Sequence, residues 1–245
     1  MFALSFYNSS EDKLFLARDK FGEKPLYFYK HKDGSFYFGS EPKAIFALLG
    51  FKLPINVEHI RRFLVNGYKS LYKENCTFFE GLEELKAGYC IEIKPFDKFL
   101  NYPWINSKKI NQNNEMSYHE AVQGTKERLY KSLEIRLRSD VPMAFCLSGG
   151  IDSNALVAIA KRVFDYEVHG FTIMNSDIRY EEREMVEHSV KKLKIKHTSI
   201  AVNKNNFLEN LSKIVKYHDS PISTISYYAH WLLMESISNN GYKVS

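Results

Sequence analysis

The sequence predicts an α/β protein built from two different halves, and three observations carry this prediction. From residue 2 to about 95, short aromatic-rich segments are separated by tight turns, which is typical of antiparallel strands. From about residue 116 onward, apolar segments of strand length alternate with segments of helix length. Such alternation predicts a parallel sheet with helices on both faces. In that second half, one apolar segment runs directly into a glycine-rich turn at residues 148–153 that opens a helix.

Turn and cap residues define the expected elements of the first half. Lys32-Asp33-Gly34 lies between two aromatic segments and is a strong hairpin signal. Pro42 suits the first turn of a helix. We expect strands at residues 2–7, 13–18, 26–29, 35–38 and 89–93, and helices at 42–49 and 57–66.

The second half opens with a helix start signal. Ser117 and Glu120 have the spacing of a capping box, in which each side chain binds the backbone N–H of the other residue. The preceding segment is polar and aperiodic, so we expect residues 97–115 to link a domain at 1–96 to a domain at 116–245. We expect strands at 142–147, 168–173, 196–201 and from 242, and helices at 153–164, 180–193, 204–216 and 224–238.

Composition narrows the class of protein. The chain has 245 residues, of which 44% are hydrophobic and 26% charged, as in globular enzymes. The net charge of +5 is spread along the chain, which argues against nucleic-acid binding. We find no signal peptide and no uncharged apolar run long enough for a membrane helix, so we expect a cytoplasmic protein. The three cysteines form no Cys-x-x-Cys pair and lie in apolar stretches, which predicts reduced, structural thiols.

The turn Ser148-Gly149-Gly150-Ile151-Asp152-Ser153 has the features of a phosphate-binding loop. Adjacent glycines let the backbone turn tightly and approach a ligand. The following helix offers free N–H groups and the positive end of its dipole. Asp152 adds an oxygen ligand for Mg²⁺. The loop lacks the Gly-Lys-Ser/Thr of Walker loops and the three spaced glycines of dinucleotide folds. An ordinary strand-to-helix turn is the alternative interpretation.

These residues carry a family resemblance. The loop at 148–153 resembles the pyrophosphatase loop, or PP-loop, of synthetases that adenylate a substrate and release pyrophosphate. Arg18–Tyr27 and Ser40–Ile45 resemble the late part of the glutaminase domain of the asparagine synthetase B family. The resemblance to the synthetase domain of that family continues at His169–Ile173, Glu181–Glu184 and His218–Pro221.

The resemblance implies a fold and a reaction. It implies part of an antiparallel glutaminase domain of the N-terminal-nucleophile type, followed by part of a doubly wound parallel-sheet synthetase domain. In the full-length enzyme, Mg-ATP would convert aspartate into an aspartyl-adenylate with release of pyrophosphate. Ammonia derived from glutamine would then displace AMP and give asparagine. The implied partners are these small molecules, without nucleic acid or membrane, and a homodimer is one option for the full-length assembly.

The resemblance also implies a set of ATP-binding residues, although it assigns no catalytic residue to this chain. Asp152 would bind the Mg²⁺ that accompanies pyrophosphate. Two strand residues beside the adenine would contact the base largely through their main chains, although as plain core residues they would need no such role. Glu181, Glu182 and Glu184 are interpreted as a helix-start preference, and Asp219 as part of a helix preface. The implied ATP site consists of Leu147, Ser148, Gly149, Gly150, Asp152, Ser153 and Ile173.

Departures from the family pattern shape the functional expectation. Family glutaminases use an N-terminal cysteine as nucleophile, whereas this chain has Phe2 at that position and its first cysteine is Cys76. We therefore expect a fragment of a longer enzyme that does not itself hydrolyse glutamine. Two alternatives stay open. One is a related PP-loop amidotransferase that acts on another carboxylate, such as a sugar acid or an antibiotic precursor. The other is a non-catalytic remnant that binds nucleotide weakly.

Overall fold

The chain divides into two units, and it crosses between them more than once. The computed structural model describes residues 1–94, 99–105, 115–174, 182–202 and 205–245. The first unit comprises Met1–Asn111 and Lys216–Ser223, and the second comprises Gln112–Val215 and Thr224–Ser245. The chain therefore returns to the first unit after most of the second is complete.

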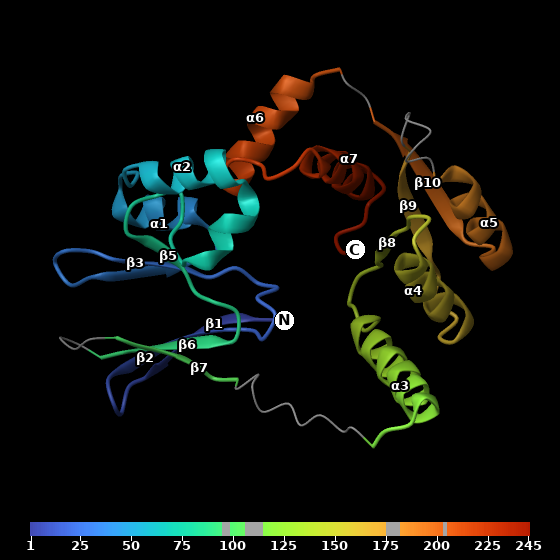
Figure 1. Ribbon diagram of the computed structural model, residues 1–245, viewed down its shortest axis with the longest axis horizontal. Coiled ribbons are helices and arrows are strands. Elements are labelled where there is room, and N and C mark those ends of the chain that lie inside the picture. Colours follow the sequence, from blue (N-terminus) through green and yellow to red (C-terminus); the bar gives the residue numbers. More distant parts are fainter. Residues whose placement is uncertain (95–98, 106–114, 175–181, 203–204) are drawn as a thin grey trace. The chain divides into compact units, whose positions relative to one another are not determined.

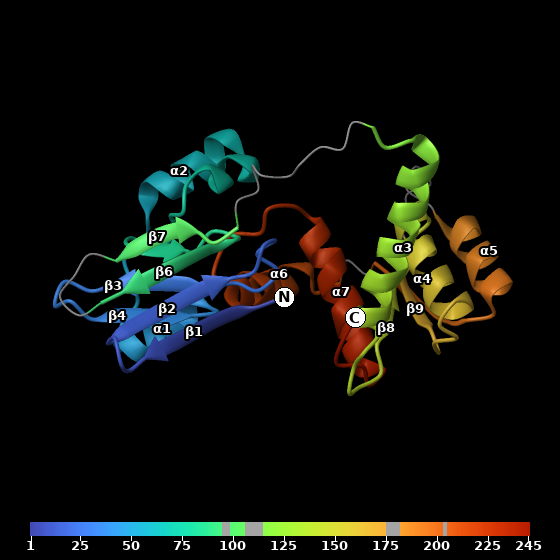
Figure 2. The same ribbon diagram turned by 90° about the horizontal axis from the view of Figure 1, so that it is seen from below.

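Two antiparallel sheets form the first unit (Figures 1 and 2). One has the order β1 (Ala3–Asn8), β2 (Lys13–Arg18), β6 (Tyr89–Ile93), β7 (Leu100–Pro103). The other has the order β4 (Phe36–Gly39), β3 (Tyr27–Lys30), β5 (Leu82–Glu84). The helical elements of this unit are α1 (Pro42–Leu49), α2 (Val57–Asn66) and the 3-10 helix η1 (Tyr68–Lys73).

The two sheets bury a shared apolar layer. Leu16 and Ile91 of the first sheet and Phe28 of the second lie in one buried cluster. A second cluster, which contains Ile45 and Phe46, packs α1 against the other side of the β3–β4–β5 sheet. The β-rich first unit thus has a layered core, and its antiparallel strands confirm the sequence prediction.

Apolar side chains also occupy the outer face of the first sheet. Leu4 and Phe6 of β1 pair with Ala17 and Phe15, on the face away from the buried Leu16, and are 42% and 60% exposed. Leu100 and Tyr102 extend this face on β7 and are 57% and 38% exposed. This sheet therefore carries apolar residues on both faces, as its aromatic-rich sequence predicts.

A parallel sheet organises the second unit. Its order is β10 (Lys196–Ala201), β9 (His169–Met174), β8 (Ala144–Cys146). Val244 continues the sheet on the far side of β8, where it pairs in parallel with Met143 and its carbonyl accepts a 2.9 Å hydrogen bond from the Ala144 N–H. The helices are α3 (Tyr118–Arg136), α4 (Ile151–Arg162), α5 (Arg183–Leu193), α6 (Phe207–His218) and α7 (Ser226–Asn239).

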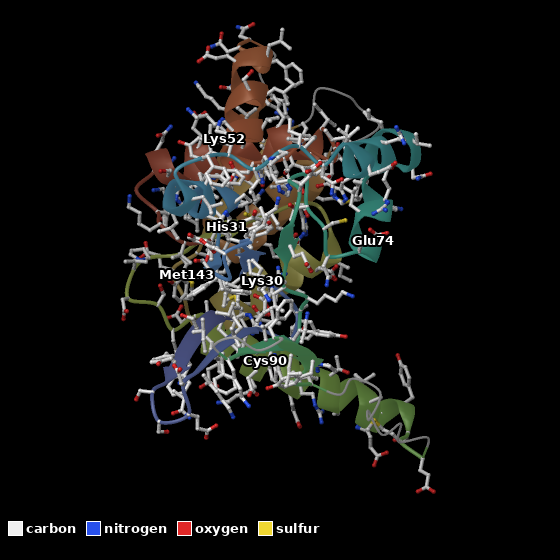
Figure 3. The ribbon with its side chains drawn as sticks, turned by 90° about the vertical axis from the view of Figure 1, so that its left-hand side faces the viewer. Lys30, His31, Lys52, Glu74, Cys90 and Met143 are labelled. Atoms are coloured by element: carbon white, nitrogen blue, oxygen red, sulfur yellow. The ribbon has the colours of Figure 1, made fainter. Side chains whose placement is uncertain are left out.

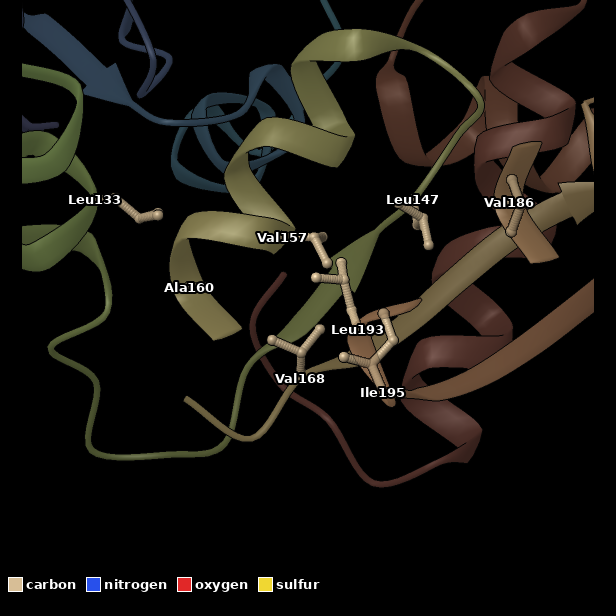
Figure 4. Close-up of a cluster of buried hydrophobic side chains, with 8 residues drawn as sticks. All are labelled: Leu133, Leu147, Val157, Ala160, Val168, Val186, Leu193 and Ile195. Carbon is tan, nitrogen blue, oxygen red and sulfur yellow. The ribbon is translucent and has the colours of Figure 1, made fainter. Parts of the chain in front are cut away.

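Helices cover both faces of this sheet. A cluster on one face joins Leu133 of α3, Val157 of α4 and Val186 of α5 to Leu147 (Figure 4). A cluster on the other face joins Leu233 of α7 to Phe171 of β9. The prediction of a parallel sheet covered on both sides is confirmed.

Other predictions meet mixed outcomes. Segment 100–103, which we expected to lie in a linker, forms β7, while residues 97–98 and 106–114 of that linker lie outside the described residues. Positions 180–181 and 204, the expected starts of two helices, also lie outside them. The three cysteines are free, with Cys90 buried on β6 (Figure 3) but Cys146 exposed despite its apolar neighbours. No helix in the described part of the chain is long and apolar enough to cross a bilayer.

Candidate functional site

The strand order places the glycine-rich loop at a topological switch point. From β8 the chain moves outward to β9 and then to β10, and it returns to the opposite side of β8 at Val244. In open parallel sheets, ligands bind beyond the carboxyl ends of the strands where the order reverses in this way. The loop at 148–153 follows the carboxyl end of β8, so it occupies that position.

The two serines of the loop brace it from within. The Ser148 N–H donates to Ser153 Oγ at 3.2 Å, and the two hydroxyl oxygens lie 2.9 Å apart. The Gly150 N–H donates back to Ser148 Oγ at 3.2 Å. Because α4 begins at Ile151, Asp152 and Ser153 stand in its first turn. The helix thus starts two residues earlier than the sequence predicts, and the loop is correspondingly tighter.

Asn154 closes the loop from the helix side. Its Nδ2 donates to the carbonyl oxygens of Ser148 and Gly150, both at 2.8 Å. A single amide in a helix has no distinctive sequence pattern, so this role of Asn154 could not be predicted from the sequence. With this clamp in place, the loop keeps its shape through its own side chains.

An acidic side chain from a distant segment already engages the loop. The Gly149 N–H donates to Glu182 Oε2 at 2.7 Å, and a Cβ on Gly149 would lie 3.0 Å from the Glu182 Cβ. A loop N–H that holds a carboxylate oxygen is suited to a phosphate oxygen, since both are anionic acceptors. From its sequence context, Glu182 is predicted only to be a helix-start residue. Its contact with the loop depends on how α5 packs, and nothing local signals it.

Asp152 offers a single carboxylate for a metal ion. It is exposed in the first turn of α4, and the described residues contain no group of three or more His, Cys, Asp or Glu side chains that could hold a metal. Mg²⁺ commonly binds through one or two carboxylates together with phosphate oxygens and water. The donor set here fits a Mg²⁺ ion that arrives with a nucleotide, and the role of Asp152 stays a prediction.

Leu147 and Ile173 direct their side chains to opposite faces of the sheet. Leu147 is 3% exposed and belongs to the cluster under α4 and α5. Ile173 packs against the cluster under α7. A base at the sheet edge therefore cannot lie against both side chains. The prediction that both contact adenine is restricted to their main chains.

Asp219 lies outside the unit that carries this loop. It belongs to the first unit, where its Oδ2 accepts hydrogen bonds from the Lys43 N–H at 3.2 Å and from Lys43 Nζ at 3.1 Å. Lys43 Nζ also donates to the Tyr217 carbonyl at 2.7 Å. Asp219 thus binds the first turn of α1, a contact between residues far apart in the sequence.

Comparison with known proteins gives a consistent result in both units. A family model described as asparagine synthase matches residues 124–245, and one described as glutamine amidotransferase domain matches residues 1–102. The glutamine-hydrolysing asparagine synthetase 1 of Bacillus subtilis (strain 168) is 27% identical over 225 residues, which are 91% of this chain and 34% of that protein. A putative glutamine-hydrolysing asparagine synthetase 2 of Methanocaldococcus jannaschii is 27% identical over 251 residues, covering 96% of this chain and 45% of the relative.

The chain thus spans between a third and a half of the length of these curated relatives. Among solved structures, an NH3-dependent NAD synthetase from Campylobacter jejuni covers 50% of this chain and 53% of its own, with 16% identity and a TM-score of 0.32. The fold assignment rests on the strand order of the chain itself.

Proposed function

This chain belongs to the asparagine synthetase family, and we propose that its second unit binds Mg-ATP on the loop at 148–153 to activate a carboxylate for amidation. The observation that carries this proposal is the Gly149 N–H, which holds a carboxylate oxygen at 2.7 Å beyond the carboxyl end of β8. An anionic oxygen is therefore accepted at the point where a sheet of this topology binds its ligand.

Different residues in and beside the loop would contact the phosphates, the Mg²⁺ ion and the base. The backbone N–H groups of Ser148, Gly149 and Gly150, with the Ser153 hydroxyl, would hold phosphate oxygens. Asp152 would share the Mg²⁺ that neutralises the pyrophosphate. The main chains of Leu147 and Ile173 would border the base. Such a site acts mainly by positioning and by stabilising charge, since the reacting atoms belong to the substrates.

The proposed reaction follows from the chemistry of carboxylates. A carboxylate is a poor acceptor for ammonia because an oxide ion is a poor leaving group. Attack of a carboxylate oxygen of aspartate on the α-phosphate of ATP forms an aspartyl-adenylate and releases pyrophosphate. Ammonia then attacks the acyl carbon, AMP leaves, and asparagine results. Because the chain spans less than half of its relatives, aspartate and glutamine-derived ammonia are proposed for the whole protein.

We assign the first unit to the glutaminase part of such a protein. Its support is the match of residues 1–102 to a glutamine amidotransferase domain and its two packed antiparallel sheets. A layered arrangement of this kind suits a domain of the N-terminal-nucleophile type. In this role the first unit would contribute to the release of ammonia from glutamine for use in the second.

Calorimetric titration of the 245-residue chain with Mg-ATP tests the proposal. We expect binding that depends on Mg²⁺ and that Asp152→Ala weakens about tenfold, because the metal loses its protein ligand. Glu167→Ala is the control, since it removes an exposed acid from the same unit and should leave affinity unchanged. Equal affinities of wild type and Asp152→Ala across a Mg²⁺ titration would refute the assignment of Asp152.

A further inference from the structure

Two histidine–threonine pairs cross between β9 and β10 in opposite senses. His169 of β9 lies with its Nε2 2.8 Å from Thr198 Oγ1 of β10. His197 of β10 lies with its Nε2 2.9 Å from Thr172 Oγ1 of β9. In the register of the two strands, His169 and Thr198 share the face covered by α7, while His197 and Thr172 share the face covered by α4 and α5.

Of these two pairs, His197 with Thr172 is the one that contacts Leu147, the residue before the loop at 148–153. Thr172 is buried, with an exposed fraction of 3%. Its hydroxyl donates to the Leu147 carbonyl at 2.7 Å. Its one hydrogen is thereby committed, so His197 Nε2 must be the donor to Thr172 Oγ1. The hydrogen bonds run in one direction, from His197 through Thr172 to Leu147. The other pair ends instead at Tyr242, whose hydroxyl lies 3.0 Å from His169 Nδ1.

The packing around Gly170 holds the same peptide from another side. A Cβ on Gly170 would lie 3.3 Å from Leu147 Cδ2 and 3.6 Å from His197 Cδ2. The missing side chain thus leaves room for Leu147 and His197 to pack together over β9. The Leu147 N–H continues the strand ladder by donating to the Phe171 carbonyl at 2.9 Å. Leu147 is therefore fixed at its amide, its side chain and its carbonyl.

We propose that Thr172 and His197 are positioning residues that orient the Leu147 peptide and so set the direction in which the chain enters the loop at 148–153. Leu147 immediately precedes Ser148, so a rotation of its carbonyl turns the next N–H group in the loop. The same peptide borders the base in the proposed site. This inference rests on the proposed function for its nucleotide, but the geometry that it claims exists without one.

A matched set of variants separates positioning from general stability. Thr172→Val removes the hydroxyl at nearly constant volume, and Thr172→Ser keeps it. Thr198→Val removes the hydroxyl of the opposite pair from the same sheet. In titrations of the full chain, we expect Thr172→Val to weaken Mg-ATP binding about fivefold, as loss of one buried hydrogen bond would. Thr172→Ser and Thr198→Val should stay within about twofold of wild type. Equal losses in the two valine variants would overturn the proposal.

His197 is tested by its own substitution. His197→Ala leaves the Thr172 hydroxyl in place but removes the donor that fixes its orientation. We expect an intermediate loss of Mg-ATP affinity, about two- to threefold. Wild-type affinity in this variant would exclude His197 and refute the directed chain of hydrogen bonds.

Amide hydrogen exchange provides a readout that needs no nucleotide. Thr172→Val should accelerate exchange of the Ser148 and Gly149 amides about tenfold, while Thr198→Val should leave them unchanged. Unchanged exchange in Thr172→Val would overturn the positioning role even if affinity fell. If the wild-type chain failed to bind Mg-ATP, the proposed function would fail. The exchange comparison would still decide whether Thr172 orders the loop.

Discussion

In two loops of this molecule, a carboxylate accepts hydrogen bonds from backbone N–H groups. The loops differ in the residue that supplies this carboxylate. In the first unit, Asp19 follows β2 and is 5% exposed. Its two oxygens accept hydrogen bonds from the N–H groups of Phe2, Phe21, Glu23 and Lys24. In the second unit, the loop after β8 receives one carboxylate oxygen, from Glu182, at 2.7 Å.

The Asp19 turn is closed further by its neighbour. The Arg18 guanidinium donates to the carbonyls of Gly22, Lys24 and Leu85, at 2.6 to 2.8 Å. Gly22 has a φ of +66°, and a Cβ there would lie 3.0 Å from the Ala87 Cβ. These N–H groups and carbonyls of the turn are therefore hydrogen-bonded to its own side chains, which leaves few of them for a ligand. This agrees with its interpretation from sequence as a scaffold.

The loop at 148–153 is rigid in a different way. Ser148, Ser153 and Asn154 fix its carbonyls and hydroxyls, but the carboxylate on Gly149 comes from outside and is exposed. An internal acid that saturates its turn makes a scaffold, whereas an external acid on one N–H can be exchanged for a ligand. The origin of the bound carboxylate therefore distinguishes the Asp19 turn from the loop at 148–153, which we propose as a binding loop.

Removing the carboxylate charge of Asp19, the acid within its own turn, should have the largest effect, which is a loss of stability. Burial alone would raise the pKa of Asp19, but its four N–H donors outweigh that and hold the pKa well below its usual range. Asp19→Asn turns an amide NH₂ toward two of these donors, so we expect the unfolding midpoint of the first unit to fall by about 10 °C.

Trp104 reports on this change, because its Nε1 donates to the Arg18 carbonyl at 2.9 Å. The chain has two tryptophans, so a Trp231→Phe background leaves this reporter alone. The control is Asp33→Asn in the exposed hairpin turn, where one carboxylate oxygen accepts from the Ser35 N–H at 2.8 Å. Similar midpoints for the two variants would show that saturation of Asp19 contributes nothing special.

Removing the charge of Glu182, the acid that reaches the loop at 148–153 from outside, should have a smaller effect. This change should strengthen binding of the ligand. In the proposed site, a phosphate would displace Glu182 from the Gly149 N–H, and a neutral amide competes less well for that donor than a carboxylate. We expect Glu182→Gln to tighten Mg-ATP binding about threefold without loss of stability. Glu184→Gln, two residues further along in the first turn of α5, controls for net charge and should change affinity less. Weaker binding in Glu182→Gln would mean that Glu182 assists the nucleotide and is not displaced by it.

A shift to mildly acidic pH should have the smallest effect. It should lower the stability of the second unit more than that of the first. Burial lowers the pKa of His169 and His197 below 6.5, so the folded second unit favours their neutral forms. Its stability is complete above pH 6.5 and falls as the pH drops below 6.5, because the unfolded chain then binds more protons. In the first unit, burial likewise lowers the pKa of His59, whereas the lowered pKa of Asp19 costs stability only below about pH 3.8.

Between pH 7 and pH 5, we therefore expect the unfolding midpoint of the second unit, which has His169 and His197, to fall by a few degrees, and that of the first unit, which has His59, to fall by less. Trp231, observed alone in a Trp104→Phe background, follows the second unit, and Trp104 follows the first. A parallel decline in both signals would contradict the assignment of this pH range to the histidines.

Features that depend on neighbouring residues could be predicted without the structure. Ser117 and Glu120 form both hydrogen bonds of the predicted capping box, from the Ser117 N–H to Glu120 Oε2 at 2.8 Å and from the Glu120 N–H to Ser117 Oγ at 3.2 Å. The strand, glycine turn and helix around residues 148–153 were predictable for the same reason. Such features are fixed by backbone geometry over three to six residues, which hydrophobic spacing, glycines and caps report directly.

Contacts between residues far apart in the sequence could not be predicted in this way. The contact of Glu182 with Gly149 spans 33 residues, and that of Asp219 with Lys43 spans 176. The crossing of Thr172 and His197 depends on the register of β10 against β9, and β7 arose where the sequence predicted a linker. These pairings are set by how helices and strands pack, because the free energy of a long-range contact depends on the whole fold that brings its partners together.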